Sequence, residues 1–308
     1  MKDIRVAIVG FGKIARDQHV PAIKAVPGVT LVAVASRNAS LPGLPHFATL
    51  EALLNDGPEI DAVALCTPPQ VRHGQAVTAL AARKHVMLEK PPGATVSEIA
   101  PLLATARENG RTLFATWHSR FAPAVEPLRR LLENRQISSV TITWKEDVRV
   151  WHPGQAWIFE AGGLGVFDPG INALSILTQV LPQPLFVTKA ALDFPSNRAA
   201  PIAAELDITD VSGLPIHASF DFRQTGPQSW DIHFETDKGP ITLSLGGARL
   251  SEGKEVLINE EEAEYPGLYQ RFVELASEGI CEVDLAPQQL VADAFMVGLR
   301  RAVEPFED

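Results

Sequence analysis

The feature that most constrains this chain is a glycine-rich segment that directly follows an apolar run near the N-terminus. Residues 10–15, with the sequence GFGKIA, fit the pattern G-x-G-x-x-A and come immediately after residues 4–9, which are apolar except for Arg5. Between a strand and a helix, the first glycine makes a tight turn, the second lets the backbone approach a pyrophosphate, and the small third residue packs the helix on the strand. The segment therefore predicts a dinucleotide site, although it could also be an ordinary structural turn. The predicted cofactor contacts here are Gly10, Gly12, Lys13 and Ile14.

The first 120 residues continue this alternation of short apolar runs and helical patterns. Strands are predicted near residues 4–9, 30–35, 62–66, 85–88 and 112–115. Helical spacing of apolar residues is found near 13–25, 49–55, 72–83 and 95–109. Runs that are apolar throughout are typical of parallel strands buried on both faces. This part of the chain is therefore predicted to form a doubly wound, Rossmann-type α/β domain spanning residues 1–121.

After Phe121 the pattern changes to an alternation with period two. It is found at 140–148, 216–222 and 230–236, with turn signals between the last two runs. Such alternation is typical of an antiparallel sheet with one face in water. One helix is predicted at about 169–180 and another after Pro287. We therefore expect a second domain, of α+β class, over residues 122–285.

Charge limits the partners of the chain. It has 308 residues, with 27 Lys and Arg against 37 Asp and Glu, which gives a formal net charge of −10. An acidic chain gains no attraction to nucleic acid or to an anionic membrane. No apolar run approaches the roughly 20 residues of a membrane helix, and no secretory signal is visible. We expect a cytoplasmic protein with a small-molecule substrate, no nucleic-acid or membrane partner, and either a monomeric or a homodimeric state.

The second predicted strand ends at Ser36 and Arg37, where NAD-preferring sites usually place an acidic residue that binds the ribose 2′-hydroxyl. This chain has no acidic residue there. A hydroxyl beside an arginine suits a 2′-phosphate, through charge-assisted hydrogen bonds worth about 1.5–3 kcal/mol. We therefore expect NADP to be preferred and NAD still to be used. The alternative is that Arg37 is an ordinary surface side chain.

Two further loops stand at the carboxyl ends of predicted strands, where ligands of open α/β sheets bind. Four motifs of the chain match one known family: GFGKIA at 10–15, Thr67-Pro68-Pro69 with His73, Glu89-Lys90-Pro91, and Ala161-Gly162-Gly163 leading to Asp168-Pro169-Gly170-Ile171-Asn172. In these motifs the chain resembles the Gfo/Idh/MocA oxidoreductases, and the resemblance covers essentially its whole length. The resemblance implies a Rossmann domain followed by an α+β domain with an open, mostly antiparallel sheet, and a C-terminal helix at about 286–304 that packs back on the first domain. It also implies that Thr67, Pro68, His73, Glu89 and Lys90 lie at the cofactor, with Lys90 as the catalytic lysine.

Asp168 and Asn172 are four residues apart, so a helix that begins at or just before Asp168 presents both on one face. Many members of the family carry a histidine where this chain has Asn172, so a histidine base is absent there. Glycines at 162, 163 and 165 would let the preceding loop lie close to a ligand. Asp168 could instead be a helix N-cap, with Pro169 at the first helical position.

Period-two alternation places Glu146 on the same face as Ile142 and Trp144. A carboxylate on an apolar face is costly without a partner, and either sugar hydroxyls or an arginine would suit. Trp151 and Trp230 offer flat apolar faces to a pyranose, with His118 and His152 as hydrogen-bonding groups, although Trp230 alternates with core positions. No grouping of side chains has metal-ligand spacing, and hydride transfer needs no metal.

Within the family, the nearest resemblance is to a bacterial group that oxidises L-arabinose or D-galactose at C1. It is carried by Ser36-Arg37, residues 117–121, Glu146, residues 150–153 and the pair Asp168 and Asn172. This implies an NAD(P)-dependent sugar 1-dehydrogenase that forms an aldonolactone, with Lys90, Asp168 and Asn172 as catalytic residues. Either Lys90 or Asp168 could take the C1-hydroxyl proton. Two alternatives are an inositol (cyclitol) dehydrogenase of the same family and a non-catalytic sugar-sensing regulator on the same fold.

Overall fold

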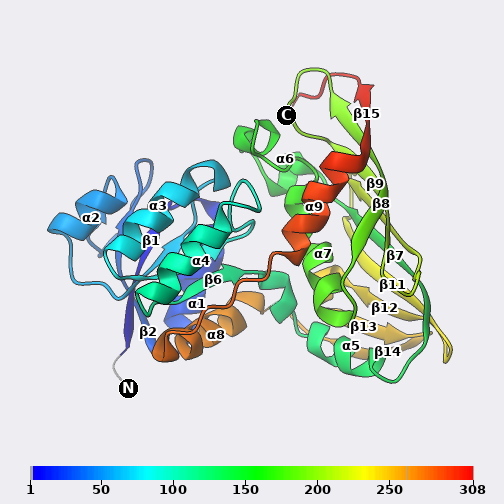
Figure 1. Cartoon of the computed structure of the whole chain (residues 1–308), viewed down its shortest axis with the longest axis horizontal. Coiled ribbons are helices and arrows are strands. Elements are labelled where there is room, and N and C mark those ends of the chain that lie inside the picture. The colour runs from blue at the N-terminus through cyan, green and yellow to red at the C-terminus, as the bar shows by residue number, and fades with distance from the viewer. Residues whose placement is uncertain (1–2, 262, 308) are drawn as a thin grey trace. The chain divides into compact units, whose positions relative to one another are not determined.

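The computed structural model describes residues 3–261 and 263–307, which divide into two compact units (Figure 1). Unit 1 comprises Met1–His118 and Tyr265–Asp284, and unit 2 comprises Ser119–Glu264 and Leu285–Asp308. The chain therefore passes from unit 1 to unit 2 close to residue 121, where we expected a boundary. It then returns to unit 1 for one segment before it ends in unit 2.

The sheet of unit 1 is parallel throughout, with the strand order β3-β2-β1-β4-β5-β6. Its strands are β1 (Ile4–Val9), β2 (Val29–Ala35), β3 (His46–Phe47), β4 (Ala62–Leu65), β5 (His85–Glu89) and β6 (Leu113–Thr116). The predicted apolar runs form five of these strands, and Val6, Ala7 and Ile8 of β1 are fully buried. The order is that of a Rossmann fold, so the predicted fold class of this part is confirmed.

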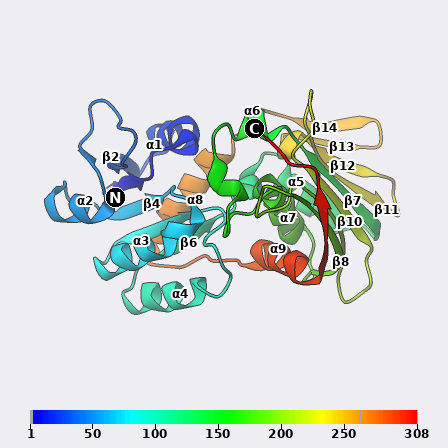
Figure 2. The same cartoon turned by 90° about the horizontal axis from the view of Figure 1, so that it is seen from above.

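Helices cover both faces of this sheet, with α3 and α4 on one side and α1 on the other (Figure 2). They are α1 (Val20–Ala25), preceded by a π-helical turn η1 (Ala15–His19), and α2 (Leu50–Asp56), α3 (Pro69–Ala81), α4 (Ile99–Glu108) and α8 (Glu264–Glu278). Because all six strands point the same way, the loops after β1, β4 and β5 leave the sheet at one edge. These three loops carry the glycine motif, Thr67 and Lys90.

The sheet of unit 2 is mixed, with the order β14-β13-β12-β11-β7-β10-β9-β8-β15. The strands are β7 (Ile137–Lys145), β8 (Phe186–Pro195), β9 (Ala203–Thr209), β10 (Ile216–Asp221), β11 (Ser229–Thr236), β12 (Ile241–Ser244), β13 (Arg249–Glu252), β14 (Glu255–Asn259) and β15 (Gly298–Val303). The pairs β10 with β7 and β15 with β8 are parallel, and the other pairs are antiparallel. The mostly antiparallel sheet that we expected is therefore present.

One face of the unit 2 sheet is covered by α7 (Phe167–Val180) and α9 (Ala286–Val297), as Figures 1 and 2 show. The other helices of unit 2 are α5 (Val125–Leu132) and the short α6 (Val148–Trp151). Helix α7 lies so close to the sheet that a Cβ on Gly170 would stand 3.0 Å from the ring of Phe220. No helix in the described parts of the chain is both long and apolar enough to cross a membrane.

The C-terminal segment differs from the expected helix at about 286–304 that returns to the Rossmann domain. Helix α9 ends at Val297, residues 298–303 form β15 beside β8, and both elements belong to unit 2. A Cβ on Gly298 would lie 2.4 Å from the Ala294 carbonyl oxygen, so glycine permits the turn out of the helix. The segment that completes unit 1 is α8 instead. Its buried side chains recur with helical spacing, at Tyr265, Leu268, Tyr269 and Phe272.

Candidate active site

The glycine loop after β1 has the geometry of a dinucleotide site. Gly10 has φ +87°, and a Cβ there would lie 2.7 Å from the Thr67 side chain, so only glycine suits this turn. A Cβ on Gly12 would meet no atom within 4 Å. That open space fits the close approach of a pyrophosphate to the backbone. The neighbouring Lys13 forms an exposed ion pair with Asp17, and Ile14 is half-buried.

The end of β2 is held in place by β3, which the sequence did not predict. The Ser36 amide donates to the Phe47 carbonyl at 2.8 Å, and His46 Nε2 lies 2.7 Å from the Ser36 carbonyl oxygen. The Ser36 hydroxyl accepts a hydrogen bond from the Asn38 amide at 3.4 Å. Arg37 is exposed. Ser36 and Arg37 thus directly follow the carboxyl end of β2, where we predicted the contact with a 2′-phosphate.

The loop after β4 leads into α3, which begins at Pro69. Thr67 donates its hydroxyl to the Gln75 side chain at 2.6 Å, and Pro68 and His73 are half-buried. Arg72, a buried residue of the same helix, donates hydrogen bonds to the carbonyl oxygens of Thr67, Glu89 and Pro91. A single guanidinium therefore ties the loop after β4 to the loop after β5.

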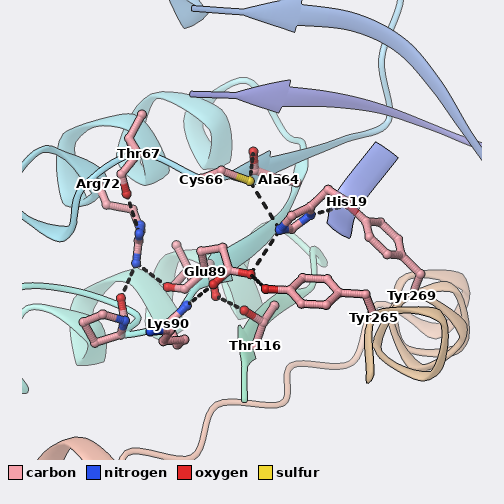
Figure 3. Close-up of polar contacts among 12 residues, drawn as sticks. His19, Ala64, Cys66, Thr67, Arg72, Glu89, Lys90, Thr116, Tyr265 and Tyr269 are labelled. Atoms are coloured by element: carbon pink, nitrogen blue, oxygen red, sulfur yellow. Dashed lines mark hydrogen bonds and ion pairs between the residues drawn. The ribbon is translucent and has the colours of Figure 1, made fainter. Parts of the chain in front are cut away.

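Glu89 lies at the centre of a buried polar network in unit 1 (Figure 3). Its Oε1 atom accepts from the Tyr265 hydroxyl at 2.8 Å and lies 3.0 Å from His19 Nε2. Its Oε2 atom accepts from the backbone amide of Lys90 at 2.8 Å. His19 Nδ1 lies 2.8 Å from the Tyr269 hydroxyl. Both oxygens of this carboxylate are thus occupied, and one of them holds the residue proposed for catalysis.

Charge stabilises the network, although Glu89, His19, Tyr265 and Tyr269 are buried. Burial would raise the pKa of Glu89, but the hydrogen bond and the positive charge of His19 lower it to about 2. Burial would lower the pKa of His19, but its contacts with Cys66 and Tyr269 and its hydrogen bond to Glu89 raise it well above its usual value. For each member of this pair, the contact with the other favours its charged form. Burial also raises the pKa of Tyr269 to about 12, so its hydroxyl stays protonated.

A second polar cluster lies in unit 2 and brings together most of the side chains that we predicted to bind substrate. Glu146 follows β7 on the same face as Trp144, and both are buried. Its Oε2 atom accepts from Trp230 Nε1 at 2.8 Å, and its Oε1 atom lies 3.2 Å from His152 Nε2. From the sequence we expected either sugar hydroxyls or an arginine as the partner of Glu146. In the structure, His152 and Trp230 supply the hydrogen bonds of this carboxylate, so it needs neither.

His152 stands between two buried carboxylates, because its Nδ1 atom lies 3.7 Å from Asp168 Oδ2 while its Nε2 atom faces Glu146. The short α6 turns the chain after Glu146 and so brings His152 back beside it. Trp151 is 37% exposed, and its ring centroid lies 4.8 Å from that of Trp230. The cluster thus combines an aromatic surface with one imidazole that lies between two buried carboxylates.

Asp168 lies in the first turn of α7 and is not its N-cap, because the helix begins at Phe167 with Val166 in the cap position. The capping alternative is therefore wrong. Asn172 follows one turn later on the same helix and is half-buried. Helical geometry places the two side chains on one face, as the spacing predicted.

Two other predicted features lie elsewhere. His118 belongs to unit 1, where its ring stacks on that of Tyr265 with centroids 5.3 Å apart. The glycines before α7 pack against protein backbone: a Cβ on Gly163 would lie 2.3 Å from the Trp157 carbonyl oxygen, and one on Gly165 2.2 Å from that of Pro201. We expected these glycines to let the loop lie close to a ligand. In the structure, Gly163 and Gly165 are instead required because the loop packs closely against other backbone of unit 2.

The sequence analysis missed His19, Arg72, Tyr265 and Tyr269 as members of the site. The helical spacing of Tyr265 and Tyr269 was a visible signal for a buried helix face, but nothing local pointed to Glu89 or His19 as their partners. In the described parts of the chain, no three His, Cys, Asp or Glu side chains gather in a way that could hold a metal ion.

Comparison with known proteins gives consistent matches. Residues 4–116 match a family profile described as GFO_IDH_MocA, oxidoreductase family, NAD-binding Rossmann fold. The chain is 48% identical to the galactose 1-dehydrogenase of Pseudomonas fluorescens over 308 residues, covering 100% of both proteins. It also matches the crystal structure of a D-galactose-1-dehydrogenase protein from Rhizobium etli, with a TM-score of 0.95 and 56% identity, over 100% of this chain and 99% of the other.

A more distant match shows the fold alone. The structure of a 3-ketoreductase from Actinomadura kijaniata, in complex with TDP-benzene and NADP, has a TM-score of 0.84 at 19% identity. The match covers 98% of this chain and 100% of the other.

Proposed function

Because this chain belongs to the Gfo/Idh/MocA oxidoreductase family, we propose that it is an NAD(P)-dependent sugar dehydrogenase that oxidises the anomeric carbon of D-galactose, and also that of L-arabinose. The observation that carries the proposal is the full-length similarity, at 48% and 56% identity, to two galactose 1-dehydrogenases. The product would be the aldonolactone. D-Galactose and L-arabinose have the same ring stereochemistry and differ at C5, so one site can accept both.

The cluster in unit 2 supports a sugar as the substrate. The tilted pair of Trp151 and Trp230 offers aromatic surface of the kind on which the C–H face of a pyranose packs. His152 and Asp168 beside it can donate and accept hydrogen bonds with ring hydroxyls. Glu146 holds both Trp230 and His152, so we assign it the task of positioning these two side chains.

The reaction removes a hydride from C1 and a proton from the C1 hydroxyl, and a C1=O double bond forms. A nicotinamide cofactor, held by the glycine loop and the loops after β4 and β5, would supply the hydride acceptor. We assign removal of the proton to either Lys90 or Asp168, the two groups that the family resemblance implies. Asn172, on the same helix face as Asp168, would hold a neighbouring hydroxyl. None of these steps requires a metal ion.

A substrate panel tests this proposal. The purified protein is assayed at 340 nm with D-galactose, L-arabinose, D-glucose and myo-inositol, each with NADP and with NAD. We expect turnover of D-galactose and L-arabinose, and formation of the lactone, which hydroxylamine traps. Turnover of inositol alone, to a ketone, would identify a cyclitol dehydrogenase. Binding of the sugars without turnover would identify a sensor.

Arg37 is predicted to select the cofactor. Replacing it with alanine should raise KM for NADP by roughly 10-fold or more and leave KM for NAD almost unchanged, because the side chain pairs only with the 2′-phosphate. Arg107→Ala, which removes another exposed arginine of unit 1, serves as a control and should change neither value. A lower KM for NAD than for NADP in the unmodified protein, with an unchanged ratio in Arg37→Ala, would contradict the assignment.

A further inference from the structure

We infer that His19, Glu89, Tyr265 and Arg72 form a positioning network that holds the backbone of Lys90 in its working place. The inference rests on the proposed catalytic role of Lys90 and names four residues that act through it. None of them needs to contact the substrate. Figure 3 shows the network at the end of β5.

The first step of the argument is that the Lys90 loop is held at three backbone atoms. Glu89 Oε2 accepts the Lys90 amide at 2.8 Å. The guanidinium of Arg72 donates to the carbonyl oxygens of Glu89 and Pro91, one on each side of Lys90. With the peptide groups fixed in this way, the position of Nζ depends only on the side-chain rotamers. This is the arrangement that a group placed for proton transfer needs.

The second step concerns the cost of burying Glu89, which is only 3% exposed. An ionised carboxylate in the interior is strongly destabilising unless it is paired and hydrogen-bonded. His19, fully buried, and the Tyr265 hydroxyl supply this compensation at Oε1. An apolar side chain would fill the same volume at lower cost, but it could not hold the Lys90 amide. The buried charge is therefore better explained by positioning than by stability.

The third step is that the network joins segments that are far apart in the chain. His19 ends the π-helical turn that follows the glycine loop, and π turns are frequent at functional sites. Tyr265 and Tyr269 come from α8, the segment that returns to unit 1. Cys66 Sγ lies 3.5 Å from His19 Nε2. The position of Lys90 is thus coupled to the glycine loop through His19, and to α8 through Tyr265.

A double-mutant cycle with Glu89→Gln and Lys90→Ala tests the inference. Glu89→Gln keeps the shape of the side chain but removes the charge that pairs with His19. We expect kcat to fall by about 10- to 100-fold, since small misplacement of a catalytic group has effects of this size. The dissociation constant of NADP should rise by a smaller factor than kcat falls, because both carboxylate oxygens of Glu89 are engaged within unit 1 and reach Lys90 through its backbone amide. In the Lys90→Ala background, Glu89→Gln should produce no further loss, since its effect passes through Lys90.

Asp61→Asn is the matched control, because Asp61 is a paired carboxylate of unit 1 whose partner is Arg5. It should lower the melting temperature without changing kcat. If Glu89→Gln does not fold, Tyr265→Phe is tested instead, because it removes one hydrogen bond from the same carboxylate. It should lower kcat by a smaller factor than Glu89→Gln, and it should cause no further loss of kcat when combined with Lys90→Ala.

An unchanged kcat in the folded variants would overturn the inference, and so would an equal further loss in the Lys90→Ala background, which indicates general structural damage. Normal turnover by Lys90→Ala alone is a different result. It would overturn the proposed function and, with it, this inference.

Discussion

Lys90→Ala is expected to lower kcat by at least about 100-fold, which corresponds to about 2.7 kcal/mol of activation free energy. The physical reason is that the ammonium or amine group at this position takes part in moving the C1-hydroxyl proton, and alanine has no group that can replace it. The measurement is steady-state turnover of D-galactose at 340 nm with saturating cofactor. Binding of NADP, followed by quenching of tryptophan fluorescence, should persist.

The control for this prediction is Lys24→Ala, which removes an exposed lysine from α1 of the same unit. It should retain full turnover. If Lys90→Ala binds cofactor and turns over sugar at a near-normal rate, Lys90 has no catalytic role. If instead both turnover and cofactor binding are lost, Lys90 is needed mainly to hold the nucleotide.

Asp168→Asn is expected to produce the second large effect, a loss of kcat of about 10²-fold or more. The amide has nearly the same shape as the carboxylate, so α7 should keep its packing, but it cannot accept a proton. Asp168 is buried and has the His152 ring 3.7 Å from its Oδ2 atom, so the substitution changes the chemistry of this cluster rather than a solvated charge. Binding of NADP should be unaffected.

The pH profile of kcat in this variant also separates the two candidate bases. A base works only when it is deprotonated, so the rate of the unmodified protein should fall on the acid side. If Asp168 is the base, the residual activity of Asp168→Asn should lack this acid limb. If Lys90 is the base, the limb should remain. Asp207→Asn, on the exposed side of β9, is the control and should match the unmodified protein. A kcat within twofold of normal in Asp168→Asn would contradict any catalytic role.

Much of the fold could be predicted because its signals are local. In β1 the residues from Val6 to Val9 form an unbroken, buried apolar run, as burial on both faces requires, and the glycine pattern marks the turn after it. In β7 the alternation of Val140, Ile142 and Trp144 identified the buried face, and the same alternation correctly placed Glu146 with them. Periodicity of two or 3.6 residues is a property of the backbone, so a single sequence displays it.

The predictions that were wrong concern which helix or strand packs against which part of the fold. The sequence correctly indicated a helix after Pro287, but helical spacing does not say which unit receives its apolar face. Helix α9 packs on β8 in unit 2, although we had expected this C-terminal helix to pack on unit 1. In the structure, α8 belongs to unit 1 instead. Strand β15 was missed because it exists only through its pairing with β8.

The sequence by itself determined the Rossmann unit, the glycine turn after its first strand and the mostly antiparallel character of the second sheet. Tertiary structure alone decided the partners of the two buried carboxylates. Glu89 is satisfied by residues 70 and 176 positions away, and Glu146 by His152 and by Trp230, 84 positions away. A strand or a turn depends on the local backbone, so its own residues show a periodic pattern or a glycine at a set position. The hydrogen bonds of a buried charge come instead from whichever donors the folded chain brings within about 3 Å.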